Sequence, residues 1–468
     1  MIKKVSFYFL FVLVFTKVMF LSTGCANIVA PTGGPRDSLP PVLISVTPED
    51  SSLNFTGNRV TFVFNEFVDL QNVRENLIVS PTPKIDPIVD FKLRTVNVRI
   101  KDTLEPNTTY SYNFGNSIRD NNEGNQLRNF TYVFSTGSRL DEEQLTGNVV
   151  LAETGKVDTT LTVLLHRSAD DSAIVKERPR FITRLDSSGR FNFRNLPPGT
   201  FYLYALKDDG GTRRYLSKTQ LFAFHGRPVA VGDSNRPITL YAFAEPDDEP
   251  KKPAAAPTLR ERNNQEKRLS FQTSLEGDQQ DLLSSFEFRF PNPLRTFDST
   301  AVKFTDYSFT PITAYSFSRD STNKIVTLQH TWQPDSTYNL IIATNFAEDS
   351  SGRKILKPDT ISFKAKKLTD YGQVRLRFPT LNLALNPVLQ LVQSDKVVFS
   401  HAFTAKEFFA KLFKPGEYDI RILYDDNRNQ MWDAGSFFGN HRQPEHVVSL
   451  PTKITIKGNW EFDKVFNF

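Results

Sequence analysis

The sequence predicts an all-β protein built from tandem β-sandwiches. Short segments in which apolar and polar residues alternate, such as 60–64, 96–100 and 110–114, are typical of strands. Turn clusters such as 120–124 separate them, and the use of 41 Phe residues alongside many Thr and Val favours strands over helices. Two internal repeats then indicate that each of two sandwich architectures occurs twice.

The bulk composition is that of a folded protein of several domains. The chain has 468 residues, of which 39% are hydrophobic and 23% charged, so global disorder is excluded. The net charge of +5 includes Lys3, Lys4 and Lys17, and removing this leader leaves 5 − 3 = +2. A nearly neutral mature chain gives no electrostatic reason to expect nucleic acid as a partner.

The N-terminus has the pattern of a secretory signal. Lys3 and Lys4 precede a mainly apolar run at 5–20, small residues follow at 22–24, and the only cysteine of the chain is Cys25. One cysteine excludes an intramolecular disulfide. The apolar run contains Lys17 and is short for a membrane span of about 20 residues, so a cleaved leader is preferred over an uncleaved anchor.

A lone cysteine directly after small residues resembles a bacterial lipobox, although Leu21 stands four residues before it instead of three. The resemblance implies that 1–24 is a lipoprotein signal peptide and that Cys25 is acylated. No acidic residue follows at 26–29, which by the same resemblance favours the outer membrane, on its periplasmic face. The segment 25–41 is rich in Pro and Gly, so we expect it to be an extended tether.

The first repeat pairs 42–137 with 268–366. The segments 104–110 and 332–338 share a Pro-x-Ser/Thr-Thr-Tyr core, and 118–124 aligns with 347–352. Their offsets are 332 − 104 = 228 and 347 − 118 = 229. The tyrosines of these elements, Tyr110 and Tyr338, are expected at a strand start, with the ring in the core and the hydroxyl at the rim.

Residues 42–137 resemble the SbsA-type bacterial Ig-like domain. The resemblance rests on the opening at 46–48, the segment 64–69, the strand ending in Tyr110, the turn at 119–124 and the closing element 134–136. The second copy is a looser match. The proline-rich start after Cys25 resembles Ig-like lipoproteins of the Bacteroidetes group.

The second repeat pairs 145–244 with 371–468, with 196–202 aligned to 413–419. A strand, a hydrophobic-Pro-Gly turn and an aromatic strand resemble the transthyretin-like (carboxypeptidase regulatory-like) β-sandwich. Taken alone, 404–412 favours a helix, but its alignment with 190–196 predicts a strand. The segment 245–267 is polar and Pro-rich, as expected of a linker. The predicted domains are therefore Ig-like 42–138 (module 1), transthyretin-like 139–244 (module 2), Ig-like 268–368 (module 3) and transthyretin-like 369–468 (module 4).

No motif for catalysis is present. The sequence has no G-x-S-x-G, H-E-x-x-H or phosphate-binding loop, and its six histidines lack zinc-site spacing. Glu66 and Asp69 are a conceivable acid–base pair, but on a strand edge they are better explained as solvated or turn-capping carboxylates. We therefore expect a protein that is not an enzyme.

The segment 424–433 is the best candidate for a metal site. Asp425, Asn427, Asn429 and Asp433 stand at positions 1, 3, 5 and 9, and Met431 offers a backbone carbonyl at position 7, a pattern that suits calcium. Gln430 occupies the sixth position, where such loops usually have Gly, and no terminal Glu follows. The alternative is an Asn/Asp-rich turn closed by its own backbone hydrogen bonds, which the corresponding segment 208–212 of module 2 favours.

Trp432, Phe437 and Phe438 suggest a binding surface on the same insertion, because exposed aromatic side chains favour interfaces. The alternative is that these rings seal the end of the sandwich core.

The preferred function is a non-enzymatic scaffold or accessory lipoprotein at the outer membrane, anchored by lipid and docking another envelope protein or outer-membrane complex. The alternatives are a glycan-binding module, for peptidoglycan or surface polysaccharide, and a hydrolase with its site at a domain seam. No cofactor is expected beyond the calcium hypothesis.

Overall fold

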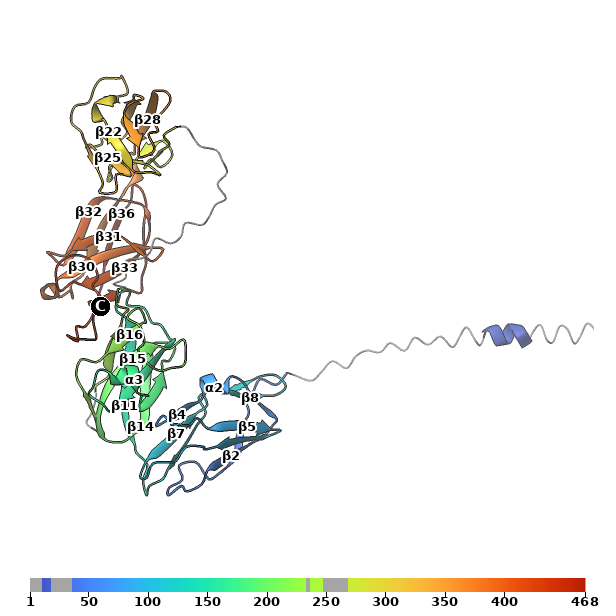
Figure 1. The fold of residues 1–468 in the computed structure, drawn as a ribbon. Coiled ribbons are helices and arrows are strands. Elements are labelled where there is room, and N and C mark those ends of the chain that lie inside the picture. The colour runs from blue at the N-terminus through green and yellow to red at the C-terminus, as the bar shows by residue number, and fades with distance from the viewer. Residues whose placement is uncertain (1–10, 18–35, 233–235, 247–267, 468) are drawn as a thin grey trace, which may run out of the picture. The chain divides into compact units, whose positions relative to one another are not determined.

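The computed structural model describes residues 11–17, 36–232, 236–246 and 268–467 (Figure 1). Apart from a helical segment at 11–17 and very short helical turns, these residues form strands and loops. The fold class predicted from the sequence, tandem β-sandwiches, is confirmed. None of the helices among the described residues is both long and apolar enough to span a membrane.

Module 1 is a sandwich of antiparallel strands around a core of aromatic and β-branched side chains, among them Phe62, Phe64, Phe114 and Phe134. One sheet has the order β1 (Leu43–Thr47), β2 (Arg59–Phe64), β6 (Thr95–Arg99), β5 (Ile88–Lys92). The second has the order β10 (Thr131–Ser135), β7 (Thr109–Asn113), β4 (Ile78–Ser80), and a small third sheet contains β3 (Val68–Leu70), β8 (Ile118–Asp120), β9 (Gln126–Leu127). A single helical turn, α2 (Val73–Asn76), lies between β3 and β4.

Module 3 repeats this topology. Its first sheet has the order β19 (Gln272–Thr273), β21 (Phe286–Arg289), β25 (Ile325–Gln329), β24 (Ser316–Arg319). The second has the order β20 (Gln279–Gln280), β28 (Asp359–Ala365), β26 (Thr337–Ile342), β23 (Val302–Asp306), and β22 (Leu294–Phe297) pairs with β27 (Ala347–Asp349).

The two copies also share their predicted tyrosine. The Tyr110 hydroxyl accepts the N–H of Glu105 at 2.8 Å, and the Tyr338 hydroxyl accepts the N–H of Gln333 at 2.9 Å, five residues upstream in both cases. Both rings are buried. The expectation of a core ring with its hydroxyl at the rim is therefore confirmed.

Modules 2 and 4 share a second topology. In module 2 the first sheet has the order β14 (Arg190–Leu196), β11 (Glu143–Leu151), β18 (Ile238–Ala242). The second sheet has the order β13 (Phe181–Arg184), β12 (Leu161–His166), β15 (Gly199–Lys207), β16 (Phe222–Phe224), and β17 (Val229–Val231) also pairs with β15. The helical turn α3 (Ala173–Lys176) joins β12 to β13.

In module 4 the first sheet has the order β32 (Glu407–Phe413), β29 (Gly372–Arg377), β36 (Glu461–Val465). The second sheet has the order β31 (Lys396–Ala402), β30 (Pro387–Gln393), β33 (Gly416–Tyr424), β34 (His446–Ser449), and β35 (Ile454–Ile456) also pairs with β33. In each module one strand pair is parallel, β11 with β18 and β29 with β36. The segment 404–412 thus contributes a strand, as the repeat predicted and as its isolated sequence did not.

Candidate functional site

The predicted site lies on one loop, residues 425–445, which joins β33 to β34 in module 4. The corresponding connection of module 2, between β15 and β16, spans 208–221. The module 4 loop is longer, and it contains all the residues for which the sequence predicts metal or ligand binding. Cys25, the predicted lipidation site, lies outside the described residues.

Asp425 organises the first half of this loop. Its side chain is buried, and its two carboxylate oxygens accept the N–H groups of Arg428 (2.6 Å), Asn429 (3.2 Å) and Gln430 (2.7 Å). Gln430 has φ 63°, a left-handed conformation in the place where a calcium loop usually has Gly. The side chain of Asp425 therefore serves as the hydrogen-bond acceptor around which the turn closes.

The amides of the loop close its second half. Oδ2 of Asp433 accepts the side-chain amides of Asn427 and Asn429, both at 2.7 Å. Oδ1 of Asn429 accepts the N–H of Met431 at 2.7 Å. The structure thus brings together the side chains of Asn427, Asn429 and Asp433, while Asp425 contacts the same loop through backbone N–H groups.

Glu445 is a member of this network that the sequence analysis missed. Its carboxylate accepts the N–H groups of Asp426 (2.8 Å) and Asp433 (3.1 Å) and is buried. Burial raises the pKa of Glu445, and the neighbouring Asp425 and Asp433 raise it further, while the two N–H donors lower it. The spacing of known metal-binding motifs does not predict Glu445, because it lies 20 residues beyond Asp425. The only sequence feature that could have indicated it is a single Glu directly before an apolar strand.

No group of three or more His, Cys, Asp or Glu side chains within the described part of the chain is arranged to hold a metal ion. The oxygens of Asp425, Asp433 and Glu445 accept hydrogen bonds from the loop itself, which is what the self-closing turn requires. Calcium binding by this loop stays a prediction.

The aromatic residues of the loop do not form one exposed surface. Trp432 packs against Val388, Leu423 and Val447, and its indole N–H donates to the Glu445 carbonyl at 2.6 Å. Phe437 is only 2% exposed, so the expectation that it lies on an exposed binding insertion is wrong. Phe438 is 43% exposed and stacks on Tyr215 at 5.9 Å between ring centroids.

Phe437 is buried because it inserts into module 2. Its ring lies 5.1 Å from Phe222, 5.2 Å from Phe224 and 5.8 Å from Tyr204, measured between centroids. Its edge-on orientation towards these rings is a favourable aromatic geometry. The outer face of the β15–β16 pair is therefore covered by a side chain more than 200 residues further along the sequence.

Polar contacts surround this insertion. The N–H of Phe437 donates to the Glu245 carboxylate at 3.1 Å, and Gln443 donates its amide to the Phe224 carbonyl at 3.1 Å. His441 Nε2 lies 2.8 Å from Asp171 Oδ2, and the N–H of Val447 donates to the Ala152 carbonyl at 2.8 Å. We call this contact between modules 2 and 4 the clamp; it comprises Asp171, Tyr204, Tyr215, Phe222, Phe224 and Glu245 with Phe437, His441 and Gln443.

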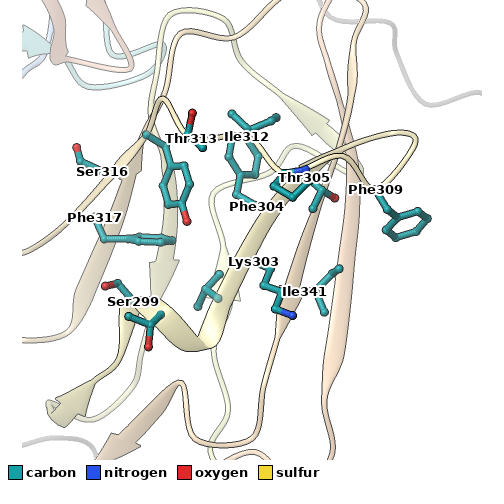
Figure 2. Close-up of a pocket in the computed structure, with 14 residues that line it drawn as sticks. Ser299, Lys303, Phe304, Thr305, Phe309, Ile312, Thr313, Ser316, Phe317 and Ile341 are labelled. Atoms are coloured by element: carbon teal, nitrogen blue, oxygen red, sulfur yellow. The ribbon is translucent and has the colours of Figure 1, made fainter.

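A groove of about 800 Å³ lies in module 3, beside the edge strand β23 and the segment 309–317 (Figure 2). Six of its lining residues carry hydroxyl groups, and Lys303 is the one charged residue among those that line it. Figure 2 shows Phe304 and Phe317 reaching into the groove, whereas Phe309 stands apart from them at its end. The groove offers apolar surface, hydroxyl groups and one cation, but no pair of acid and base.

Asp69 and Glu66, the carboxylates considered as an acid–base pair, are not arranged for catalysis. Oδ2 of Asp69 accepts hydrogen bonds from Nε and Nη2 of Arg119, at 3.0 and 2.6 Å, so it is held in an ion pair. Burial raises the pKa of Glu66, as do the nearby carboxylates of Asp120, Asp37 and Glu123, but no contact among the described residues joins it to a nucleophile.

Comparison with known proteins places module 1 in a family. Residues 37–136 match the model of the bacterial Ig-like domain (Big_5), so the chain contains a bacterial Ig-like domain. A search of curated protein sequences gave no match.

The chain also matches several solved structures at low sequence identity. The Bacillus anthracis TIE protein is 10% identical, with 93% of this chain and 76% of that chain covered, at a TM-score of 0.18. BcpA, the major pilin subunit of Bacillus cereus, is 9% identical (69% and 99% covered, TM-score 0.17). The N-terminal part of the bacterial S-layer protein SbsC is 16% identical (45% and 45% covered, TM-score 0.16). At such scores the likeness says nothing about function.

Proposed function

We propose that this chain is a non-enzymatic lipoprotein of the bacterial cell envelope, a scaffold or accessory subunit that docks another envelope protein at the outer membrane. The observation that carries the proposal is the clamp. The longest insertion of module 4, where a ligand site was expected, places Phe437 in a packed contact with module 2. A loop used in this way joins two modules into one body and leaves its central aromatic ring unavailable to a ligand.

The chemistry of the described residues supports a passive role. The four sandwiches have closed hydrophobic cores, and the contacts described above include no nucleophile next to a base. The match of residues 37–136 to a bacterial Ig-like domain is compatible with this role, although an Ig-like fold hosts many functions and does not by itself identify one. The carboxylates that are buried, such as Asp120 and Asp349, accept backbone hydrogen bonds that close turns.

Anchoring follows from the chemistry of Cys25. An acylated N-terminal cysteine carries more than one acyl chain, and a single chain gives only marginal, reversible binding. Residues 26–42 then separate the lipid from β1 (Leu43–Thr47). The periplasmic face of the outer membrane is the side proposed.

The anchor is tested by expressing the full chain and its Cys25→Ser variant in a bacterium that processes lipoproteins. We expect the wild-type protein to begin at Cys25, to incorporate labelled palmitate and to float with outer-membrane vesicles. The variant should remain unlabelled and stay out of the membrane fraction. A wild-type protein that starts elsewhere or carries no acyl chain overturns the proposal.

The docking role is tested by purifying the wild-type protein from native membranes and identifying the proteins that accompany it. We expect a stoichiometric envelope partner. The matched control is the Cys25→Ser protein, from which a partner that lies at the membrane should be lost. Recovery of the chain alone, under mild detergent and after cross-linking, argues against docking.

Glycan binding is the second candidate function, and the groove of module 3 is the observation that favours it. Sugar rings pack their C–H faces on apolar and aromatic side chains while their hydroxyls bond to groups such as Ser316 and Thr313. The indole N–H of Trp432 already donates within the loop, so the groove is the better candidate. Retention on peptidoglycan or surface polysaccharide should fall in Phe309→Ala and Lys303→Ala but not in Trp432→Ala; equal retention in all of them excludes the groove.

A further inference from the structure

Several large apolar side chains gather at one end of module 1. The tip of the β5–β6 hairpin carries Leu93, and the loop after β2 carries Phe67; they are 61% and 48% exposed. Leu39 and Val42, which precede β1, are 68% and 56% exposed. Phe91, next to the hairpin tip, is also exposed. We call Leu39, Val42, Phe67, Phe91 and Leu93 the tether-end patch.

Hydrogen bonds and a cation–π contact hold these segments at the same end of the sandwich. Val42 and Asn65 exchange two hydrogen bonds, N–H of Val42 to Oδ1 of Asn65 and N–H of Asn65 to the Val42 carbonyl, at 2.7 and 3.0 Å. The N–H of Val68 donates to the Leu93 carbonyl at 2.9 Å, and the Arg94 guanidinium lies 5.6 Å from the Phe67 ring centroid. The start of β1, the end of β2 and the β5–β6 tip therefore meet there.

The conformation of Leu93 is unusual for its residue type. The pairing of Lys92 with Thr95 makes Leu93 and Arg94 a two-residue hairpin turn, and Leu93 has φ 54°. Turns of this length normally use Gly or Asn at a position with positive φ, because a branched side chain is strained there. A leucine at this tip, exposed and in a disfavoured conformation, is better explained by a role for its side chain than by the turn itself.

The chain from the proposed lipid anchor arrives at this same end. The described part that leads into module 1 starts at Arg36, and the Asp37 carbonyl accepts the side-chain amide of Asn125 at 3.1 Å, beside β8 and β9. In Figure 1 the described chain enters module 1 next to β8. Cys25 is 36 − 25 = 11 residues earlier, which limits its distance from Arg36 to at most ~40 Å even for a fully extended chain.

We propose that the tether-end patch contacts the lipid surface and seats module 1 on the membrane, an inference that rests on the acyl anchor at Cys25. Loop tips that carry leucine, valine and phenylalanine partition into the interfacial region of a bilayer. A tethered module is held at a high effective concentration next to the surface, so even weak insertion is populated. Membrane contact also accounts for an apolar cluster that the module leaves in water.

Charge near the patch favours a neutral membrane surface as the occupant. Lys92 and Arg94 are basic, while Asp37, Glu66 and Glu123 are acidic, so both signs are present. A mixed set of charges provides no strong attraction to anionic lipid. The apolar side chains must therefore supply the affinity, and the effect should persist in zwitterionic vesicles and at high salt.

The test uses the processed, acylated full-length protein reconstituted in phosphatidylcholine vesicles. The acylated sulfur of Cys25 does not react with thiol reagents, so Leu93→Cys introduces one site for a polarity-sensitive fluorophore. The control is Leu53→Cys, because Leu53 is a leucine of similar kind, 45% exposed, just before the loop that enters β2 at the other end of the module. Phe67→Cys provides a second position within the patch.

We expect the labels at 93 and 67 to show blue-shifted emission and at least twofold stronger quenching by brominated lipid than the label at 53. Equal quenching at all three positions in protein that floats with the vesicles overturns the proposal and leaves the anchor intact. Protein that does not float with the vesicles overturns both.

Discussion

Asp120 and Asp349 show how one buried carboxylate can close a turn. Oδ1 of Asp120 accepts the N–H groups of Asn122, Glu123 and Gly124, and Oδ2 accepts that of Asn125. Asp349 has the same place in module 3 and accepts the N–H groups of Ser351 and Arg353. The sequence repeat aligned these turns. That both carboxylates are buried, 1% exposed, depends on packing from distant strands and could not be predicted from the repeat.

The pKa of Asp120 makes module 1 sensitive to acid. Burial raises this pKa, but the four N–H donors outweigh burial and hold it below the ordinary value of 3.8. A depressed carboxyl pKa stabilises the fold above the unfolded-state value, and the contribution is lost as the pH falls through the folded-state value. We expect Asp120→Asn to lower the free energy of unfolding at neutral pH by about 1–3 kcal/mol and to flatten its dependence on acid pH.

Urea unfolding of the full chain between neutral and acid pH, followed for module 1, measures both effects. Asp86→Asn is the matched control, because Asp86 is exposed and should leave the unfolding curve unchanged. Equal losses in the two variants would contradict the role given to Asp120.

The two alternatives for the Asp425 loop make opposite predictions. A calcium site should lose thermal stability on chelation with EDTA, and Asp425→Ala should abolish that response. A self-closing turn should unfold at the same temperature with or without EDTA, with Asp425→Ala less stable in both conditions. Because Asp425 already accepts three backbone N–H groups, we expect the second result, and a calcium-dependent midpoint would show that the first is correct.

At the scale of elements, the strand β32 (Glu407–Phe413) is the most instructive. The local sequence 404–412 has good helix formers and favours a helix. Its pairing with β29 and the packing of Phe408 against Phe399 and Phe413 determine the strand instead. Local propensity is a weak preference that tertiary contacts override, and only the alignment with module 2 revealed the strand in advance.

A strand at β32 predicts opposite outcomes for two adjacent phenylalanines, because consecutive side chains point to opposite faces. Phe408 is buried and Phe409 is 40% exposed, with the Arg375 guanidinium 4.6 Å from its ring centroid. We expect Phe408→Ala to cost about 3–5 kcal/mol in the free energy of unfolding. Phe409→Ala should cost roughly 0.5–1 kcal/mol. Chemical denaturation of both variants checks this, and equal losses would contradict the assigned faces.

At the scale of the molecule, the contact between modules 2 and 4 was beyond sequence reasoning. Aromatic residues and glycines marked 432–439 as an unusual insertion. Nothing in their spacing indicates that Phe437 meets Phe222 and Phe224, because the contact joins segments more than 200 residues apart. The loop was therefore recognised, but its partner was not.

The clamp should open when Phe437 is removed. We expect Phe437→Ala to cost about 3–5 kcal/mol of packing, since the ring leaves a cavity among buried aromatic side chains. Hydrogen exchange of the Val447 N–H, which donates to Ala152, should become faster while β30 and β33 stay protected. Phe438→Ala is the control, because its ring is partly exposed and should change exchange much less. Equal effects of the two variants would assign the clamp to the loop as a whole.

His446, which also lies between modules 2 and 4, makes the contact between these modules dependent on pH. Its ring lies 4.7 Å from Tyr241 of module 2 and 5.0 Å from Tyr424 of module 4, between centroids. Burial lowers the pKa of His446 below its ordinary value of 6.5, and Asp426 partly opposes this shift. Because the docked state favours the neutral ring, the clamp is fully stable above the ordinary histidine pKa and weakens as the pH falls through the lowered value.

We therefore expect protection of the Val447 N–H from hydrogen exchange to fall as the pH is lowered below the ordinary histidine pKa of 6.5, after correction for the intrinsic exchange rate. His446→Phe keeps an aromatic ring between the two tyrosines and removes the titration, so its protection should not change over this range. His441, beside Asp171, is present in both proteins. A pH response that persists unchanged in His446→Phe would show that another group controls the contact.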